Sequence, residues 1–254
     1  MSGAKMDVFG ELLAPKYLRW LWDGFLVTIG LSLCVCVVST VGGFLLCVAR
    51  MEGRGPVGWA ARAYLSVFRN TPLLVQLFFW YFGAASFLPE GFLPWLNTPR
   101  QIELPGLALR WPSFEFIAGF FGLTLFTTAF IAEEFRAGVQ GVGAGQYSAA
   151  AAVGLTRWQA WRWIILPQAL RNAFSPLVGQ YMHAVKNSSL TMAIGLAELS
   201  YASRQVETQT FKTFQAFGIA TLLYLLLIVL IELGAQAWQR RRRFRRLGAQ
   251  GGAA

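Results

Sequence analysis

The chain has 254 residues, of which 56% are hydrophobic and only 13% are charged. Soluble domains carry about 25% charged residues, so this composition excludes an ordinary soluble domain and predicts an integral membrane protein. The formal net charge of +10 is compatible with nucleic-acid binding, but the cations lie between long apolar segments. That arrangement indicates membrane topology and a lipid bilayer as partner, with no nucleic acid.

The first 23 residues form an aromatic and amphipathic segment that includes Tyr17, Trp20 and Trp22. Such a pattern suits a helix lying along the outer membrane interface. We therefore expect three parts: an outer interfacial segment at 1–23, a transmembrane domain at 24–239, and a basic cytoplasmic tail at 240–254.

Stretches that lack charge mark five membrane crossings. About 20 apolar residues span the hydrocarbon as a helix, which predicts an all-α integral membrane fold with five transmembrane helices. The cysteines all fall in the first stretch, where they act as small apolar residues and hold no metal. In chain order, the stretches are Asp23 to Arg50 with 26 residues between, Arg69 to Glu90 with 20, Glu115 to Glu133 with 17, residues 172–197 with 26 including Lys186, and Lys212 to Glu232 with 19.

The loops between these stretches differ in charge. Residues 50–69, 133–171 and 232–254 carry 14 Lys and Arg in total, whereas the alternate loops carry 7. Because cation-rich loops stay in the cytoplasm, the amino terminus is predicted outside and the carboxyl terminus inside.

The most ordered loop pattern lies between the third and fourth predicted crossings. Residues Ser148–Val153 are nearly all alanine, a strong helix former, and Gly154 can take the left-handed conformation that ends such a helix. Thr156 with Gln159 forms a capping box for a second, aromatic helix, which Pro167 is expected to break. By periodicity alone this helix pair either packs the bundle or serves as a docking surface on the cytoplasmic face.

One spacing within this loop resembles the coupling-loop signature of ABC importer permeases. Two alanines are followed four residues later by glycine, then by nine residues and Ile-X-Leu-Pro. In that family the loop docks into a groove on the ATP-binding subunit and transmits its closure. The resemblance implies a coupling loop over residues 143–167, with coupling residues Ser148, Ala149, Ala150, Gly154, Leu155, Arg157, Trp158, Ile164, Leu166 and Pro167.

Further segments are similar to motifs of polar-amino-acid permeases, most of all those for glutamate and aspartate. They are FRNTPLLVQ at 68–76, AFIAE at 129–133 and KNSSL at 186–190. Two positions depart from the family pattern. Ser148 stands where glutamate is frequent, so an ion pair with the ATP-binding subunit is missing or comes from elsewhere, for example from an arginine of the loop. Asn187 stands where aspartate is usual.

The resemblance also implies partners. The chain has no GxxxxGK[ST] phosphate-binding loop, so it is not expected to be an enzyme or to bind a cofactor, and ATP with Mg²⁺ belongs on a partner chain. The family implies two ATP-binding subunits, a second permease subunit that is either a related chain or another copy, and a periplasmic amino-acid-binding protein. The expected location is the bacterial inner membrane, as a multi-pass protein.

Lys186 is predicted near mid-membrane, because the fourth stretch is centred close to it. An ammonium there costs about 3 kcal/mol or more unless it is paired or hydrated. One hypothesis is that it meets a substrate carboxylate, and the other is a structural ion pair with Glu133 or Glu134. The candidate substrate path comprises Lys186, Asn187, Ser188, Ser189, Gln76, Thr71 and Thr127.

These features favour the permease subunit of an ATP-driven importer of polar amino acids, with glutamate or aspartate as substrate. Import of glutamine or of a cationic amino acid by the same machine is the first alternative. A stand-alone secondary transporter and a membrane-embedded lipid enzyme are more distant alternatives. The first of these usually shows an internal repeat, and the second needs a cluster of reactive groups, neither of which the sequence offers.

Overall fold

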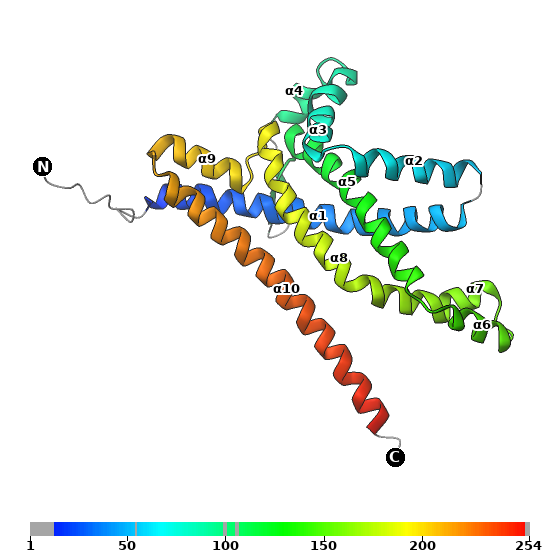
Figure 1. The fold of residues 1–254 in the computed structure, drawn as a ribbon. Coiled ribbons are helices and arrows are strands. Elements are labelled where there is room, and N and C mark those ends of the chain that lie inside the picture. The colour runs from blue at the N-terminus through cyan, green and yellow to red at the C-terminus, as the bar shows by residue number, and fades with distance from the viewer. Residues whose placement is uncertain (1–12, 54, 99–100, 105–106, 252–254) are drawn as a thin grey trace, which may run out of the picture.

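The computed structural model describes residues 13–53, 55–98, 101–104 and 107–251, with side chains at 101–110 and beyond 241 outside that description. The fold is helical, as predicted, with one short β-hairpin among the described residues. Long helices cross one another around a central first helix (Figure 1).

The first helix, α1, runs without a break over Pro15–Glu52. At 1.5 Å per residue, these 38 residues measure about 57 Å, well beyond the roughly 30 Å of hydrocarbon. The aromatic residues Tyr17 to Trp22 therefore form the first turns of the spanning helix itself, and the expected boundary at residue 23 falls inside it. Residues 1–12 lie outside the described part of the chain.

The second predicted crossing, between Arg69 and Glu90, begins at a break between two helices. Helix α2 covers Pro56–Asn70, and α3 begins at Leu73 after an extended Thr71. Because proline disfavours the helical conformation of the residue before it, the helix is interrupted at Thr71-Pro72. The chain continues through α3 (Leu73–Phe78), a π-helical turn η1 (Phe79–Gly83) and a 3₁₀ turn η2 (Ala84–Phe87).

The connection from Leu88 to Pro112 contains more regular structure than a loop. Helix α4 covers Phe92–Asn97, and strands β1 (Gln101–Leu104) and β2 (Leu107–Arg110) pair antiparallel with Gln101 opposite Arg110.

The second half of the chain contains the remaining helices. Ser113 caps α5, and its hydroxyl accepts from the Phe116 amide. The elements are α5 (Phe114–Gln140), α6 (Ala144–Ala152), α7 (Arg157–Ala160), the π-helical η3 (Trp161–Ile165), α8 (Leu166–Ser188), the 3₁₀ η4 (Ser189–Ile194), α9 (Leu199–Thr210) and α10 (Thr213–Gly251). The basic residues from Arg240 onward thus continue α10 rather than form a separate segment.

Three helices of the described chain are long and apolar enough to cross a membrane: Pro15–Met51, Phe114–Gln140 and Thr213–Arg241. The second predicted crossing reduces to a shorter apolar helix, Leu73–Phe87, and α8 falls below the same threshold. The count of five and the orientation remain predictions. In Figure 1, α6, α7 and the end of α10 lie toward the lower right, whereas α4 lies at the top and α9 at upper left.

Glycines allow α1 and α5 to approach closely. A Cβ on Gly43 would lie 2.5 Å from Cγ2 of Ile131, and one on Gly42 would lie 3.3 Å from Thr128. The packing buries Leu31, Val35 and Leu123 in one apolar cluster.

Candidate functional site

The predicted coupling loop forms a compact elbow, which we define as residues 144–165. The turn between its helices follows from local sequence. Gly154 has φ 77°, in the left-handed region, and Thr156 caps α7 through the expected reciprocal bonds with Gln159. The Gln159 side chain accepts from the Thr156 amide at 2.9 Å. The alanine helix, the glycine stop and the capping box are all confirmed.

Pro167 does not break the second helix, contrary to expectation. The helix runs from Arg157 through η3 into α8, and Pro167 lies in the first turn of α8. In η3 the bonding pattern widens, so that the Leu166 amide donates to the Trp161 carbonyl, five residues earlier. This π-helical turn tolerates a proline, which has no backbone N–H to donate. The elbow therefore continues into α8 without a break.

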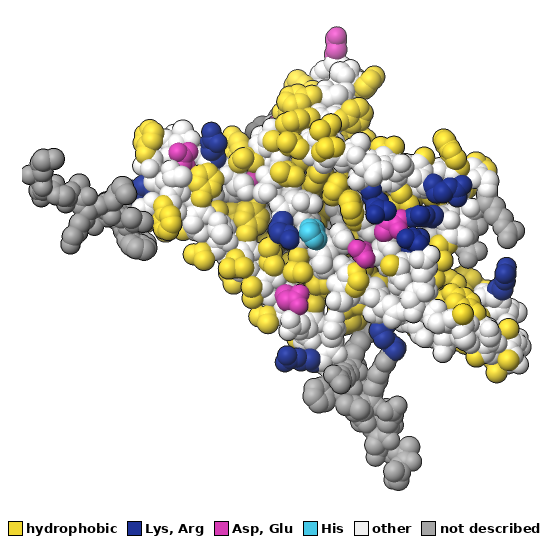
Figure 2. Space-filling view, in the orientation of Figure 1, with side chains coloured by type: hydrophobic (Ala, Val, Ile, Leu, Met, Phe, Trp, Pro, Cys, Tyr) yellow, Lys and Arg dark blue, Asp and Glu magenta, His cyan; other side chains and the backbone are white. Residues whose placement is uncertain are grey.

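The outer face of the elbow carries exposed large apolar side chains. Val153, Trp158 and Trp163 are 73%, 66% and 68% exposed, and Tyr147 is also exposed. Figure 2 shows apolar side chains gathered over this end of the molecule at lower right. An aromatic patch of this kind is typical of a surface that another protein covers.

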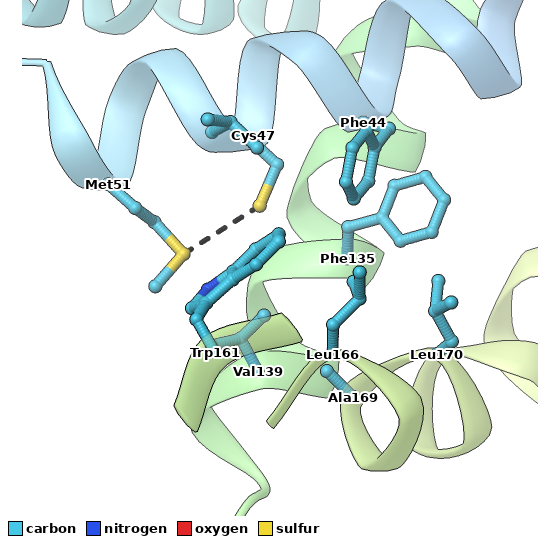
Figure 3. A pocket seen from close by; sticks show the side chains of 10 residues that line it. Phe44, Cys47, Met51, Phe135, Val139, Trp161, Leu166, Ala169 and Leu170 are labelled. Carbon is cyan, nitrogen blue, oxygen red and sulfur yellow. Dashed lines mark hydrogen bonds between the residues drawn. The ribbon is translucent and has the colours of Figure 1, made fainter. Parts of the chain in front are cut away.

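The inner face of the elbow inserts Trp161 between α1 and α5 (Figure 3). The indole lies against Phe44, Cys47, Met51, Phe135 and Val139, around a small cavity of about 20 Å³. Its ring centroid is 6.4 Å from that of Phe44. The elbow therefore contacts α1 and α5 through Trp161 and continues directly into α8.

The predicted coupling residues divide between these two faces. Ala150 is buried at 1% exposure, and Ile164, Leu155 and Leu166 are partly buried. The others point outward: Ser148, Ala149, Gly154, Arg157, Trp158 and Pro167.

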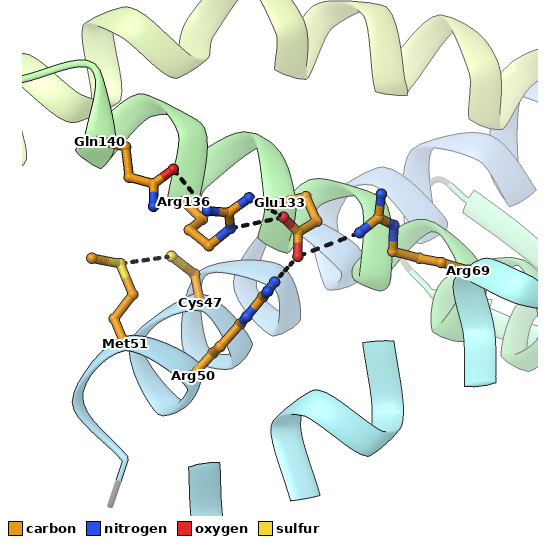
Figure 4. Close-up of polar contacts among 7 residues, drawn as sticks. All are labelled: Cys47, Arg50, Met51, Arg69, Glu133, Arg136 and Gln140. Atoms are coloured by element: carbon orange, nitrogen blue, oxygen red, sulfur yellow. Dashed lines mark hydrogen bonds and ion pairs between the residues drawn. The ribbon is translucent and has the colours of Figure 1, made fainter. Parts of the chain in front are cut away.

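A charged cluster, here the Glu133 centre, links α1, α2 and α5 (Figure 4). Glu133 Oε1 forms ion pairs with Nη1 of Arg50 and, at 3.5 Å, with Nη1 of Arg69. Its Oε2 forms an ion pair with Nη2 of Arg136 at 2.8 Å. The Glu133 side chain is only 14% exposed. This cluster cannot be recognised in the sequence, because its members are up to 86 residues apart, from Arg50 to Arg136.

Lys186 is not paired with Glu133 or Glu134. Glu133 is occupied by arginines, and Glu134 accepts from the Gln180 amide at 2.9 Å. Within the described residues no ion pair includes Lys186, whose side chain is exposed in the last turn of α8. The structural-pair hypothesis is therefore wrong for this single chain.

Two predicted path residues, Thr127 and Asn187, line one pocket of about 310 Å³, which we call the path pocket. It lies between α5 and α8 and is completed by Phe126, Phe130, Gln180, His183 and Ala184. Aromatic rings with a few amide and hydroxyl groups are typical of a small-molecule site.

The other predicted path residues bond within their own segments. Gln76 is buried, and its Nε2 donates to the Phe68 and Thr71 carbonyls, both at 3.1 Å. It thereby satisfies carbonyls that the helix break frees. Ser188 and Ser189 donate to carbonyls three residues earlier. These contacts give a structural role to Gln76, Thr71, Ser188 and Ser189.

Glu198, which the sequence did not single out, is fully buried at the start of α9. Its carboxylate accepts from the Tyr224 hydroxyl at 2.6 Å and from the Tyr201 amide at 2.9 Å. Burial raises the pKa of this carboxyl, while those hydrogen bonds oppose the shift. It joins α9 to α1 and α10.

Comparison with known proteins identifies the family. The model of the binding-protein-dependent transport system inner membrane component matches residues 39–245. The chain belongs to this family. The glutamate/aspartate import permease protein GltJ of Escherichia coli strain K12 is 33% identical over 218 residues, 85% of each chain.

Other relatives point the same way. The "Probable glutamine ABC transporter permease protein GlnM" of Bacillus subtilis strain 168 is 35% identical over 219 residues, 86% of this permease and 91% of that one. A solved amino acid ABC transporter with histidines matches with TM-score 0.75 and 27% identity, covering 89% of this permease and 95% of that chain. The resemblance to permease subunits of amino acid ABC importers is confirmed.

Proposed function

We propose that this permease carries glutamate or aspartate across the bacterial inner membrane, as one subunit of an ATP-driven importer. Two ATP-binding subunits, a second and related permease chain, and a periplasmic binding protein complete the machine. The chain itself binds no nucleotide in this proposal, and ATP with Mg²⁺ is held by the ATP-binding subunits.

The observation that carries the proposal is the two-faced elbow. Its outer face leaves Trp158 and Trp163 without cover, and its inner face locks Trp161 against α1 and α5. A partner that grips the outer face and moves would shift the helices that line the path pocket. Such a lever is what an importer needs when the nucleotide is hydrolysed on another chain.

The identity of 33% to GltJ, a glutamate/aspartate permease, supports an acidic substrate. The identity of 35% to GlnM supports the same machine with glutamine as substrate. Lys186, exposed and without a carboxylate partner in the described structure, favours an anionic solute near the path pocket.

The test is reconstitution of the permease with its ATP-binding subunits and binding protein in lipid vesicles. We expect ATP hydrolysis to rise when the binding protein is loaded with glutamate or aspartate, with uptake of the labelled amino acid. Stimulation by glutamine alone would establish the alternative substrate. Uptake of no amino acid, with or without ATP, would reject the transport function.

A matched pair of variants tests the elbow. Trp163→Ala removes an exposed ring and should abolish most of the stimulated hydrolysis without destabilising the permease. Trp59→Ala removes a ring of α2 that is 68% exposed, as Trp163 is, and lies outside the elbow, so it should leave stimulation close to wild type. Equal stimulation in both variants would mean that the exposed elbow face is not the docking surface.

A further inference from the structure

A second pocket, of about 280 Å³, opens where α1, α2 and α5 meet, and we call it the arginine pocket. It is lined by Arg50, Arg62, Arg69 and Glu133, together with Leu65, Ser66 and Asn70. Figure 4 shows Arg50 and Arg69 converging on Glu133 from two different helices.

The charges of this pocket do not balance. Both oxygens of Glu133 are engaged, Oε1 by Arg50 and Arg69 and Oε2 by Arg136. Arg62 takes no part in any ion pair of the described residues, and its side chain is exposed. Guanidinium groups do not deprotonate in proteins, so the three arginines that line the pocket outnumber its one carboxylate at every physiological pH.

The arginine pocket is adjacent to the path pocket. The Arg69 guanidinium carbon lies 5.6 Å from the ring centroid of Phe130, and that ring lines the path pocket. Arg69 is itself 42% exposed, so a solute can reach it. One aromatic ring thus separates the two pockets.

We propose that the arginine pocket is a release site, where Arg62 and Arg69 receive the carboxylates of an acidic amino acid after it leaves the path pocket. This inference rests on the proposed function. A guanidinium fork matches a carboxylate with two parallel hydrogen bonds, and the Asn70 and Ser66 oxygens can accept from the ammonium group of the solute. A cationic amino acid would be repelled by the same charges, which separates acidic from basic substrates.

A phosphate of an anionic lipid offers similar chemistry to arginines at a membrane surface. The contact between Arg69 and Phe130 favours the solute, because it places the cations beside the path pocket. The experiment therefore includes vesicles with and without phosphatidylglycerol.

The decisive variant is Arg62→Gln, because Arg62 lies outside the ion pairs of Glu133 and its loss leaves them intact. In the reconstituted complex we expect the maximal rate of glutamate uptake to fall about tenfold, the effect of losing one charged hydrogen bond. Arg62→Glu should lower it further. Arg240→Gln, which removes an exposed arginine of α10 outside this pocket, should keep the wild-type rate.

Size-exclusion yield of the assembled complex checks that each variant folds. Glutamate uptake within twofold of wild type in both Arg62 variants would overturn the release site. A defect that appears only in vesicles containing phosphatidylglycerol would also overturn it, since a lipid phosphate would then be the occupant. Absence of uptake by the wild-type complex would instead count against the proposed function, so the two failures are distinguishable.

Discussion

The elbow and the Glu133 centre organise functional side chains in opposite ways. In the elbow, neighbours in sequence make the structure: a glycine stop, a capping box and a π-helical turn within residues 144–165. In the Glu133 centre, helices α1, α2 and α5 each contribute charges. The elbow is therefore built from local contacts, whereas the Glu133 centre exists only while three helices stay packed.

The largest effect should follow from Glu133→Ala. The change leaves Arg50, Arg69 and Arg136 facing one another without a carboxylate. Because Glu133 is mostly buried and the arginines are partly exposed, we expect a loss of about 3 kcal/mol of unfolding free energy. Denaturant unfolding of the purified permease measures it. Glu134→Gln is the control, as Glu134 bonds only to Gln180 among the interactions described; equal losses in both would contradict a special role for Glu133.

The next largest effect is expected for Trp161→Ala, which removes the indole that contacts α1 from the elbow. A fully buried tryptophan costs about 3–5 kcal/mol when truncated, and Trp161 is partly exposed, so about 2 kcal/mol is expected. Trp163→Ala on the outer face should cost less than about 0.5 kcal/mol. Thermal unfolding followed by fluorescence compares the two, and a reversed order would show that the elbow packs by its other face.

Gly43→Ala tests the packing that brings Arg50 to Glu133. The added methyl group would meet Ile131 and the backbone nitrogen of Ala132 at 3.1 Å, so α1 and α5 must separate. We expect a loss of about 1–2 kcal/mol. Gly30 lies in the same helix, and a methyl group added there would meet nothing within 4 Å. Gly30→Ala should therefore be neutral or stabilise the permease by about 0.5–1 kcal/mol. The measurement is the difference between the thermal unfolding midpoints of the two variants. Equal midpoints would mean that α1 and α5 adjust to the added methyl group without cost.

The smallest effect is expected for Thr156→Ala in the elbow. It removes the hydroxyl that accepts from the Gln159 amide at 3.3 Å. An exposed cap of this kind contributes about 1 kcal/mol, and the change should be confined to the elbow. Hydrogen exchange of the α7 amides should quicken while amides of α5 keep their protection. Loss of protection throughout α5 would show that the elbow is not a local unit.

Much of the elbow followed from the order of its residues. The alanine run, Gly154 and the Thr156 capping box each act over a few residues, and all three are found as expected. The expected helix break at Pro167 is wrong, because that expectation assumes the backbone hydrogen bonds of a regular α-helix. In the π-helical η3 the hydrogen-bond pattern is different.

The residues of the candidate substrate path were only partly predictable from the sequence. Thr127 and Asn187 do share a pocket, but Gln76 proved to cap the broken helix, with its amide bonded to the Phe68 and Thr71 carbonyls. Lys186 is the one charged residue in its apolar stretch, so the sequence marks it as a candidate. The cluster of cations, however, lies beside Glu133. A lone charge is visible in a sequence, whereas a cluster assembled from distant segments is not.

The membrane class, the all-helical fold and the local form of the elbow follow from the sequence, because composition, helix stops and caps act between neighbouring residues. The packing of distant segments sets which arginines meet Glu133, how Trp161 lies against α1 and which polar groups line the path pocket. Those contacts depend on how closely α1, α5 and α8 approach, and the spacing of α1 and α5 is set by contacts such as Gly43 against Ile131, 88 residues apart.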